Sequence, residues 1–175
     1  MNPKAVIFGC SGLELTADER AFFRDTDPLG FIVFARNIDS PDQARKLIDD
    51  LRACVARADA PVLVDQEGGR VARLKPPHWR KAPPGRVLGE LYRRDPAKGL
   101  EAARLNSRLL ANDVASIGCD VDCLPVLDVA FPDTHSVIGD RAYVSKGARL
   151  LRCVVMPDTF VGANVGLSAC LAATV

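Results

Sequence analysis

The sequence predicts an α/β fold that forms the N-terminal half of a (β/α)8 TIM-type barrel, incomplete in a chain of 175 residues. Short apolar runs alternate with helical patterns, which is typical of βα units built on a parallel sheet. Polar residues follow the later apolar runs, and in such barrels the carboxyl ends of the strands carry the active site. These polar residues are Arg36 and Asn37, Asp65 to Glu67, and Asp128. A doubly wound sheet is the alternative, but the first apolar run is not followed by a G-x-G-x-x-G turn.

The first βα unit occupies the N-terminal end of the sequence. Residues 5–9 (AVIFG) predict a strand, and residues 15–24 predict a short helix. Thr16 and Glu19 have the spacing of a capping box at the start of that helix. Residues 30–35 (GFIVFA) predict the second strand, and because this run lacks polar alternation we expect both of its faces to be covered.

The second helix and the third strand follow directly. Ser40 is expected as the N-cap and Pro41 at the first helical position of a helix over residues 40–56. Residues 60–65 (APVLVD) predict the third strand, again a continuous apolar run.

A long connection and one helix separate the third strand from the fourth. Residues 66–95 predict a connection, and they contain four prolines. A helix restarts at Asp95-Pro96 and ends at Gly118, before a strand over residues 119–129. The expected apolar face of this helix includes Leu105, Leu109, Leu110, Val114 and Ile117.

Composition excludes several classes of function. A formal net charge of +1 gives no reason to expect nucleic acid or an anionic membrane as partner. The sequence has no secretory signal and no run of the ~18 apolar residues that a membrane span needs, so we expect a cytoplasmic protein. Six cysteines without disulfide or zinc spacing, together with two histidines, predict buried free thiols and no metal site.

In the stretch VLVDQEGGRVARL, several charged residues directly follow the end of the predicted third strand. Asp65 stands at that end, where its carboxylate can accept hydrogen bonds from the neighbouring hydroxyls of a polyol. Gly68 and Gly69 allow a tight turn or a close backbone approach to a ligand. Arg70 and Arg73 supply planar donors suited to carboxylates or sugar oxygens.

Two other interpretations of this stretch remain open from the residues alone. In the first, an ion-pair cluster shapes the turn, with Asp65 or Glu67 held by Arg70. In the second, QEGGR is the phosphate loop of a nucleotide-binding α/β domain. Acids beside the glycines disfavour the second interpretation because they repel phosphate, and the lysine of a P-loop is absent.

GDRAY, residues 139–143, is a second candidate site. Arg141 and Asp140 are either part of such a site or a surface ion pair, and Tyr143 either binds or simply packs. His135 is expected to be a loop histidine without a partner.

Four stretches, in this order, resemble the N-terminal half of the bacterial β-N-acetylhexosaminidases of glycoside hydrolase family 3: GFIVFARNI, VLVDQEGGRVARL, CLPVLDV and IGDRAY. The resemblance runs from about residue 5 to Tyr143, and D-x-E-G-G-R-V-x-R is specific by its length. It implies a cytoplasmic TIM-barrel glycosidase that releases terminal β-linked N-acetylglucosamine from peptidoglycan fragments during cell-wall recycling. It makes Asp65 the acid that binds sugar hydroxyls, with Arg73 and Arg141 as further substrate contacts.

The resemblance also implies a retaining reaction, in which a carboxylate nucleophile forms a glycosyl-enzyme intermediate that water then opens. In the family a histidine–aspartate pair on a mobile loop serves as acid/base, and a K-H-x-P-G-H segment contacts the sugar. This sequence contains no K-H-x-P-G-H segment, and His78 and His135 fall outside the family's catalytic positions. We therefore expect no catalytic residue in this chain and no glycosidase activity from it alone. No metal or organic cofactor is implied.

Two parts of the sequence differ in character. Residues 1–143 are expected to be the N-terminal part of a glycoside hydrolase family 3 barrel, and residues 144–175 an atypical low-charge tail. A full barrel takes about 250 residues, so we expect a truncated or frameshifted half of such an enzyme. The alternative is a non-catalytic sugar-binding or half-barrel assembly module. Either way, the expected ligand is a small N-acetylglucosaminyl saccharide.

Overall fold

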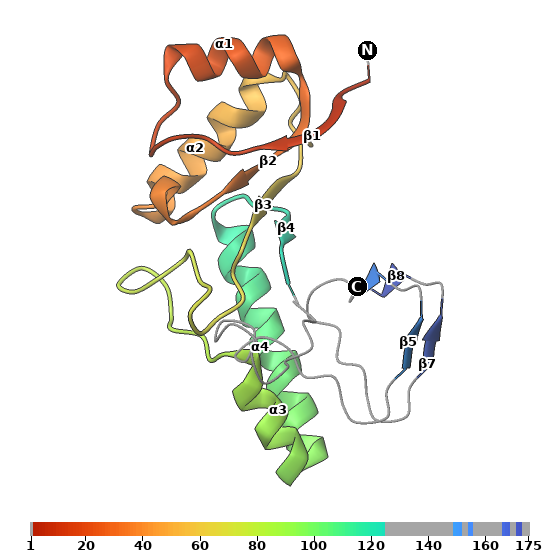
Figure 1. Cartoon of the computed structure of the whole chain (residues 1–175). Coiled ribbons are helices and arrows are strands. Elements are labelled where there is room, and N and C mark those ends of the chain that lie inside the picture. The colour runs from red at the N-terminus through yellow and green to blue at the C-terminus, as the bar shows by residue number, and fades with distance from the viewer. Residues whose placement is uncertain (1, 125–148, 152–153, 156–165, 169–170, 173–175) are drawn as a thin grey trace, which may run out of the picture. The chain divides into compact units, whose positions relative to one another are not determined.

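The computed structural model describes residues 2–124 and four short segments of the remaining chain, 149–151, 154–155, 166–168 and 171–172 (Figure 1). The chain divides into two compact units. The first consists of Met1–Gln66, Ala72–Arg80 and Ala111–Asp122, and the second of Glu67–Val71, Lys81–Leu110 and Cys123–Val175.

The sheet of the first unit has four parallel strands that lie side by side in sequence order (Figure 1). They are β1 (Lys4–Phe8), β2 (Pro28–Val33), β3 (Val62–Val64) and β4 (Val121–Asp122). This order and direction confirm the predicted βα pattern, although each strand starts or ends a few residues from its expected limits. Because the strands are parallel, their carboxyl ends meet at one edge of the sheet.

Local sequence signals set the helices of the first unit. Thr16 Oγ1 accepts a hydrogen bond from the N–H of Glu19 (3.1 Å), and the Glu19 carboxylate accepts one from the N–H of Thr16 (2.9 Å). The predicted capping box is therefore present at the start of α1 (Ala17–Thr26). Ser40 caps α2 (Pro41–Cys54) as predicted, and a short 3-10 helix, η1 (Ala35–Asn37), follows β2.

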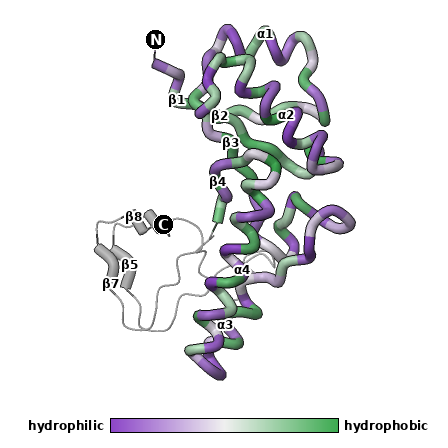
Figure 2. The backbone as a smooth tube through the Cα atoms, turned by 180° about the vertical axis from the view of Figure 1, so that it is seen from behind, coloured by the Kyte–Doolittle hydropathy of each residue, from purple (hydrophilic) through white to green (hydrophobic). Residues whose placement is uncertain are grey.

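The core of the first unit lies between the two helices and one face of the sheet. Figure 2 shows hydrophobic residues along β2 and β3, whereas hydrophilic and hydrophobic residues alternate along α1 and α2. The buried side chains from these four elements are Phe23, Phe31, Val33, Ala44, Leu47, Ile48, Leu51, Val62 and Val64. This is the pattern of amphipathic helices that cover a hydrophobic sheet.

The other face of the sheet is less covered than predicted. Successive residues of a strand point to opposite faces, so Ile32 and Leu63 face away from the Phe31 and Val62 side. Both Ile32 and Leu63 are only partly buried. The expectation that both faces of the second strand are covered is therefore confirmed for the face that carries Phe31 and only in part for the face that carries Ile32.

The second unit contains a helix that the sequence analysis missed. Residues 66–95 were expected to be one long connection, but α3 (Gly85–Arg94) lies within them. The prolines that suggested a connection end at Pro84, which takes an extended conformation (φ −70°, ψ 151°) as the N-cap of α3. Proline is favourable just before and at the first turn of a helix, so these residues begin α3 rather than exclude it.

Helix α4 (Pro96–Ser116) begins at the proline predicted to restart it. Gly118 follows its end with φ of +89°, as expected for a helix-terminating glycine. Its predicted apolar face is confirmed only in part. Leu110, Val114 and Ile117 are buried, whereas Leu105 and Leu109 are exposed.

Short strands are present in the described segments of residues 149–172. β5 (Arg149–Leu151) pairs in parallel with β7 (Gly166–Ser168), and β6 (Val154–Val155) pairs in parallel with β8 (Leu171–Ala172). The proposed division of the chain after residue 143 stays a prediction. Within the described residues, the helices are too short or too polar to span a bilayer.

We expect the substitution Asp50→Asn to destabilise the protein at neutral pH but not at strongly acidic pH. Asp50 Oδ2 accepts hydrogen bonds from Arg20 Nη2 (2.8 Å) and Lys46 Nζ (3.1 Å). The bond from Arg20, and then that from Lys46, hold the pKa of Asp50 below its ordinary value. The stabilisation is therefore present above the unfolded-state pKa of about 3.9 and is lost as pH falls through the lower folded-state pKa.

Urea unfolding of the wild type and the Asp50→Asn variant checks this prediction. We expect a loss of up to about 1 kcal/mol at pH 7, because the pair is partly exposed to solvent. The difference should shrink as the pH approaches 2. A difference of constant size across this pH range would contradict it.

Candidate functional site

Asp65 lies at the carboxyl end of β3 and forms an ion pair with Arg73. Arg73 Nη2 donates a hydrogen bond to Asp65 Oδ2 at 2.7 Å. About a quarter of each side chain is exposed, 22% for Asp65 and 25% for Arg73. The structure thus brings together two of the predicted substrate contacts, and both are partly exposed. The ion-pair interpretation had Arg70 holding Asp65 or Glu67. For Asp65 the observed partner is Arg73, and the pairing of Arg70 with Glu67 stays a prediction.

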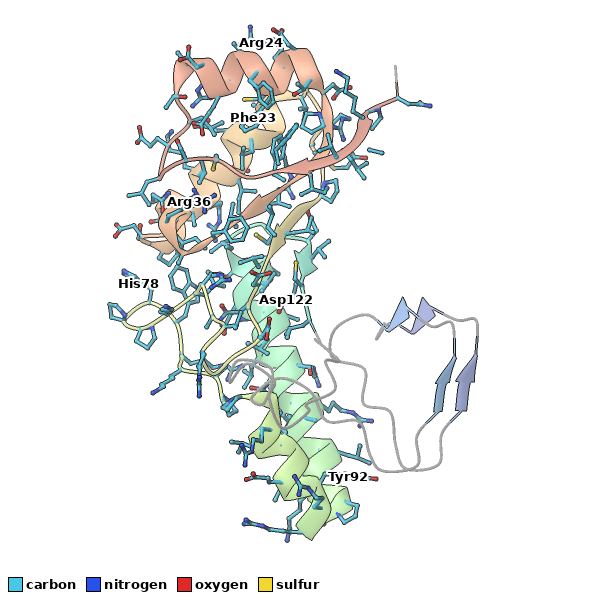
Figure 3. All side chains as sticks on the ribbon, viewed as in Figure 1. Phe23, Arg24, Arg36, His78, Tyr92 and Asp122 are labelled. Carbon is cyan, nitrogen blue, oxygen red and sulfur yellow. The ribbon has the colours of Figure 1, made fainter. Side chains whose placement is uncertain are left out.

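The ring of Phe34 lies beside two guanidinium groups at this edge of the sheet. Arg36 Cζ is 4.8 Å from the ring centre and Arg73 Cζ is 5.9 Å from it. Both distances are within the range of cation–π attraction. Arg36, the middle residue of η1, is labelled in Figure 3. The sequence analysis had read Phe34 only as a strand residue, because the pattern does not reveal which charges face an aromatic ring.

Arg36 and Asn37 were predicted as polar residues of this edge, and both contact the loop after β1. Arg36 Nε donates to the carbonyl oxygen of Cys10 (3.0 Å). Asn37 Nδ2 donates to the carbonyl oxygens of Gly12 (2.8 Å) and Cys10 (3.1 Å). Asn37 is fully buried, so it supports the loop, whereas Arg36 is exposed.

Gln66 stands between two acids in the sequence, yet it is 1% exposed. Its Oε1 accepts hydrogen bonds from the N–H groups of Arg73 (2.8 Å) and Leu74 (2.9 Å). Its Nε2 donates to the carbonyl oxygen of Leu74 (3.0 Å). Gln66 falls within the polar run Asp65 to Glu67 predicted at this strand end, but no role was predicted for it. The available signal was an uncharged amide directly after a buried strand, where a polar side chain needs internal partners.

The end of β4 also contacts this region. Asp122 Oδ1 accepts a hydrogen bond from the backbone N–H of Gln66 at 2.9 Å, which joins the ends of β3 and β4. Figure 3 shows Asp122 at the end of β4. The acid expected at the end of the fourth strand was Asp128, which lies outside the described residues.

The glycines of the motif form a tight turn in the second unit, as predicted. Gly68 and Gly69 have φ values of +85° and +60°, which side chains rarely adopt. The N–H of Gly69 donates to the carbonyl oxygen of Ala82 at 3.0 Å. A cavity of about 440 Å³ adjoins this turn, lined by Gly69, Arg70, Lys81, Ala82, Pro83 and Pro84.

The remaining candidates are the two histidines and the residues of GDRAY. His135, Asp140, Arg141 and Tyr143 lie outside the described residues. His78 is exposed and its ring packs edge-on against Trp79, with ring centres 5.7 Å apart.

Metal ligands and thiols are the other reactive groups to consider among the described residues. Among them, no group of three histidine, cysteine or acidic residues is placed to hold a metal ion. Cys10, Cys54, Cys119 and Cys123 are free thiols. Burial, and then the negative charge of Glu19, raise the pKa of Cys10 to about 11. The Cys10 thiol is therefore protonated, and not nucleophilic, at neutral pH.

Comparison with known proteins gives consistent relatives. The β-hexosaminidase of Alkalilimnicola ehrlichii is 37% identical over 141 residues, which are 81% of this chain and 40% of that protein. The crystal structure of NagZ from Neisseria gonorrhoeae in complex with N-trifluoroacetyl-D-glucosamine is similar with a TM-score of 0.72 and 30% identity, covering 79% of this chain and 40% of that one. A glycoside hydrolase family 3 β-N-acetylglucosaminidase from Paenibacillus is similar with a TM-score of 0.60 and 28% identity, covering 70% of this chain and 23% of that one.

The likeness to NagZ supports the fold prediction, an α/β sheet of the TIM-barrel type, which the described strands do not close into a barrel. The chain spans about two fifths of the length of the β-hexosaminidase that it matches. The model of the glycosyl hydrolase family 3 N-terminal domain matches residues 10–156, which include the whole Asp65–Arg73 motif. The chain therefore belongs to glycoside hydrolase family 3.

Proposed function

We propose that the Asp65–Arg73 pair is one wall of a subsite for a terminal β-linked N-acetylglucosamine residue. The observation that carries this proposal is the position of the pair, partly exposed at the carboxyl end of a strand in a family 3 chain. The names of the relatives support the choice of ligand, since they are β-hexosaminidases and one NagZ structure holds N-trifluoroacetyl-D-glucosamine. Arg141 is proposed as a further contact on the resemblance of GDRAY to the family's motif.

The chemistry of the pair suits a sugar. The contact with Arg73 uses Oδ2 of Asp65, and a carboxylate offers about four acceptor sites on its two oxygens. Asp65 can therefore accept hydrogen bonds from two neighbouring sugar hydroxyls while it stays paired with Arg73. A guanidinium has five donors, so Arg73 can likewise contact a sugar oxygen without losing Asp65.

For the whole enzyme we propose the activity of a β-N-acetylhexosaminidase in the cytoplasm. It would release N-acetylglucosamine from peptidoglycan fragments by a retaining reaction through a glycosyl-enzyme intermediate. The resemblance of the four motifs supports this proposal. In this chain Asp65, Arg73 and Arg141 would bind and orient the sugar.

We expect the 175-residue chain to bind the sugar without hydrolysing glycosides. Its sequence contains no K-H-x-P-G-H segment, and neither of its two histidines stands in a family catalytic position. This observation favours the second candidate function for the chain on its own, a non-catalytic sugar-binding module.

Release of 4-nitrophenol from 4-nitrophenyl N-acetyl-β-D-glucosaminide checks this prediction. The purified chain should give the rate of buffer alone, and a full-length relative serves as the positive control. An Asp65→Asn preparation purified in parallel reports contaminating host enzyme. Turnover by the wild-type chain well above both backgrounds would contradict the prediction.

A further inference from the structure

All described hydrogen bonds of the buried Gln66 side-chain amide are to the backbone of Arg73 and Leu74. An unpaired amide in an apolar environment is costly, so a buried glutamine needs fixed partners. Here those partners are the N–H groups of Arg73 and Leu74 and the carbonyl oxygen of Leu74, at 2.8, 2.9 and 3.0 Å. Two donors and one acceptor on consecutive residues define the position of that backbone closely.

Two adjacent residues at the end of β3 bind Arg73, one through its backbone and the other through its side chain. Gln66 binds its backbone N–H, and Asp65 binds its guanidinium at 2.7 Å. The Nε atom of Arg73 is buried, and no residue in the described part of the chain accepts a hydrogen bond from it. The orientation of the guanidinium therefore depends on the Asp65 contact and on the nearby Phe34 ring. It also depends on the position of the Arg73 backbone, from which the side chain extends.

We propose that Gln66 is a positioning residue for the sugar site, which presents Arg73 to Asp65 by fixing the backbone of residues 73 and 74. This rests on the proposed function, because Arg73 matters here as a sugar contact. An arginine side chain can adopt many rotamers. A fixed backbone position reduces the conformational entropy that this side chain loses when it binds a ligand. Gln66 itself is 1% exposed, so we expect it to act through Arg73 and not by contact with the sugar.

The substitution Gln66→Met tests this directly, because methionine has a similar length and no hydrogen bonds. We expect N-acetylglucosamine to bind about tenfold more weakly, measured by chemical-shift titration of the ¹⁵N-labelled chain. We also expect the buried Nε–H proton of Arg73 to exchange with water at least about tenfold faster, since local opening controls the exchange of buried protons. The second measurement needs no sugar.

The substitution Gln66→Glu provides a conservative rescue. A carboxyl group retains the acceptor for the two N–H groups, but when ionised its second oxygen faces the carbonyl oxygen of Leu74. When protonated it can donate to that carbonyl. Sugar binding by Gln66→Glu should therefore be weak at pH 8 and recover toward the wild-type affinity at pH 5.5, while the wild type changes little. Burial raises the pKa of such a carboxyl, which brings its titration into this range.

Gln43→Met is the matched control, because Gln43 also binds only backbone groups. Its Oε1 accepts from Asp39 N–H (2.9 Å), and its Nε2 donates to the carbonyl oxygens of Leu13 (2.7 Å) and Asn37 (3.1 Å). Gln43→Met should lower stability without changing the exchange of the Arg73 Nε–H proton.

The outcomes separate the positioning role from the proposed function. Unchanged Arg73 exchange in Gln66→Met, or an equal effect of Gln43→Met, would overturn the positioning role. If the wild type binds no sugar while Gln66→Met alone accelerates the exchange, the positioning role stands and the proposed function fails. If Gln66→Met does not fold, the rate of Arg73 exchange in Gln66→Glu relative to that of the wild type at the same pH decides, and a ratio that stays the same from pH 8 to pH 5.5 overturns the proposal.

Discussion

The substitution Asp65→Asn should weaken N-acetylglucosamine binding by about 10- to 100-fold. Asparagine keeps the shape of the side chain but removes its charge and half of its acceptor capacity. Hydrogen bonds to a charged group contribute about 1.5–3 kcal/mol, and each 1.4 kcal/mol changes the dissociation constant tenfold. The loss includes the contact with Arg73, which lies 2.7 Å from Asp65 Oδ2 and would no longer be held there by an ion pair.

Asp50→Asn is the control for Asp65→Asn. Asp50 also pairs with an arginine, Arg20, at 2.8 Å, and 26% of its side chain is exposed against 22% for Asp65. Both substitutions remove one paired carboxylate of similar burial, but Asp50 extends from α2 and not from a strand end. Equal sugar affinity in the wild type, Asp50→Asn and Asp65→Asn would show that the Asp65–Arg73 pair only shapes the turn.

The substitution Gly30→Ala should destabilise the fold by about 3 kcal/mol. An added Cβ would lie 2.3 Å from the carbonyl oxygen of Pro61 and 2.8 Å from its Cγ. That carbonyl accepts the hydrogen bond from the N–H of Phe31 at 2.9 Å, so β2 must move away from the chain that enters β3. Overpacking in a core costs about 1–3 kcal/mol, and the weakened hydrogen bond adds about 1 kcal/mol.

Gly12→Ala is the matched control for Gly30→Ala. No atom lies within 4 Å of a Cβ added at Gly12, and its φ is not in the left-handed region. Thermal unfolding followed by circular dichroism should show a lower midpoint for Gly30→Ala by roughly 6–12 °C, at about 2–4 °C per kcal/mol for a chain of this size. Gly12→Ala should unfold near the wild-type temperature. Equal midpoints for the two variants would contradict the close approach at Gly30.

The elements that the sequence predicted well are those with local signals. The capping box at Thr16, the Ser40 cap and Gly118 each depend on a few neighbouring residues, and each occurs as predicted. Helix α3 was missed because its local signal, the prolines before Gly85, was taken as evidence for an uninterrupted connection. The partial exposure of Ile32 depends on what packs against the sheet, and a strand pattern alone does not contain that information.

The residue types of the candidate site could be predicted from the sequence, but which side chains contact each other could not. The motif pointed to Asp65 and Arg73, and the structure shows that they meet. The contacts of Gln66 and Phe34 with Arg73 form only when the segment after β3 folds back onto the strand ends, because Arg73 is seven or more residues from each of them in the sequence. Asp122 lies at the end of β4, and the predicted Asp128 lies outside the described residues and stays a prediction.

The central claim is that the Asp65–Arg73 pair binds N-acetylglucosamine, and a titration of the ¹⁵N-labelled chain tests it most directly. Glucose, which lacks the acetamido group, serves as the reference sugar. The account predicts saturable shifts concentrated at the backbone signals of residues 65–74 and at the Arg73 side chain, with weaker binding of glucose. Absence of saturable shifts at these signals, or shifts that saturate only elsewhere in the chain, would contradict it.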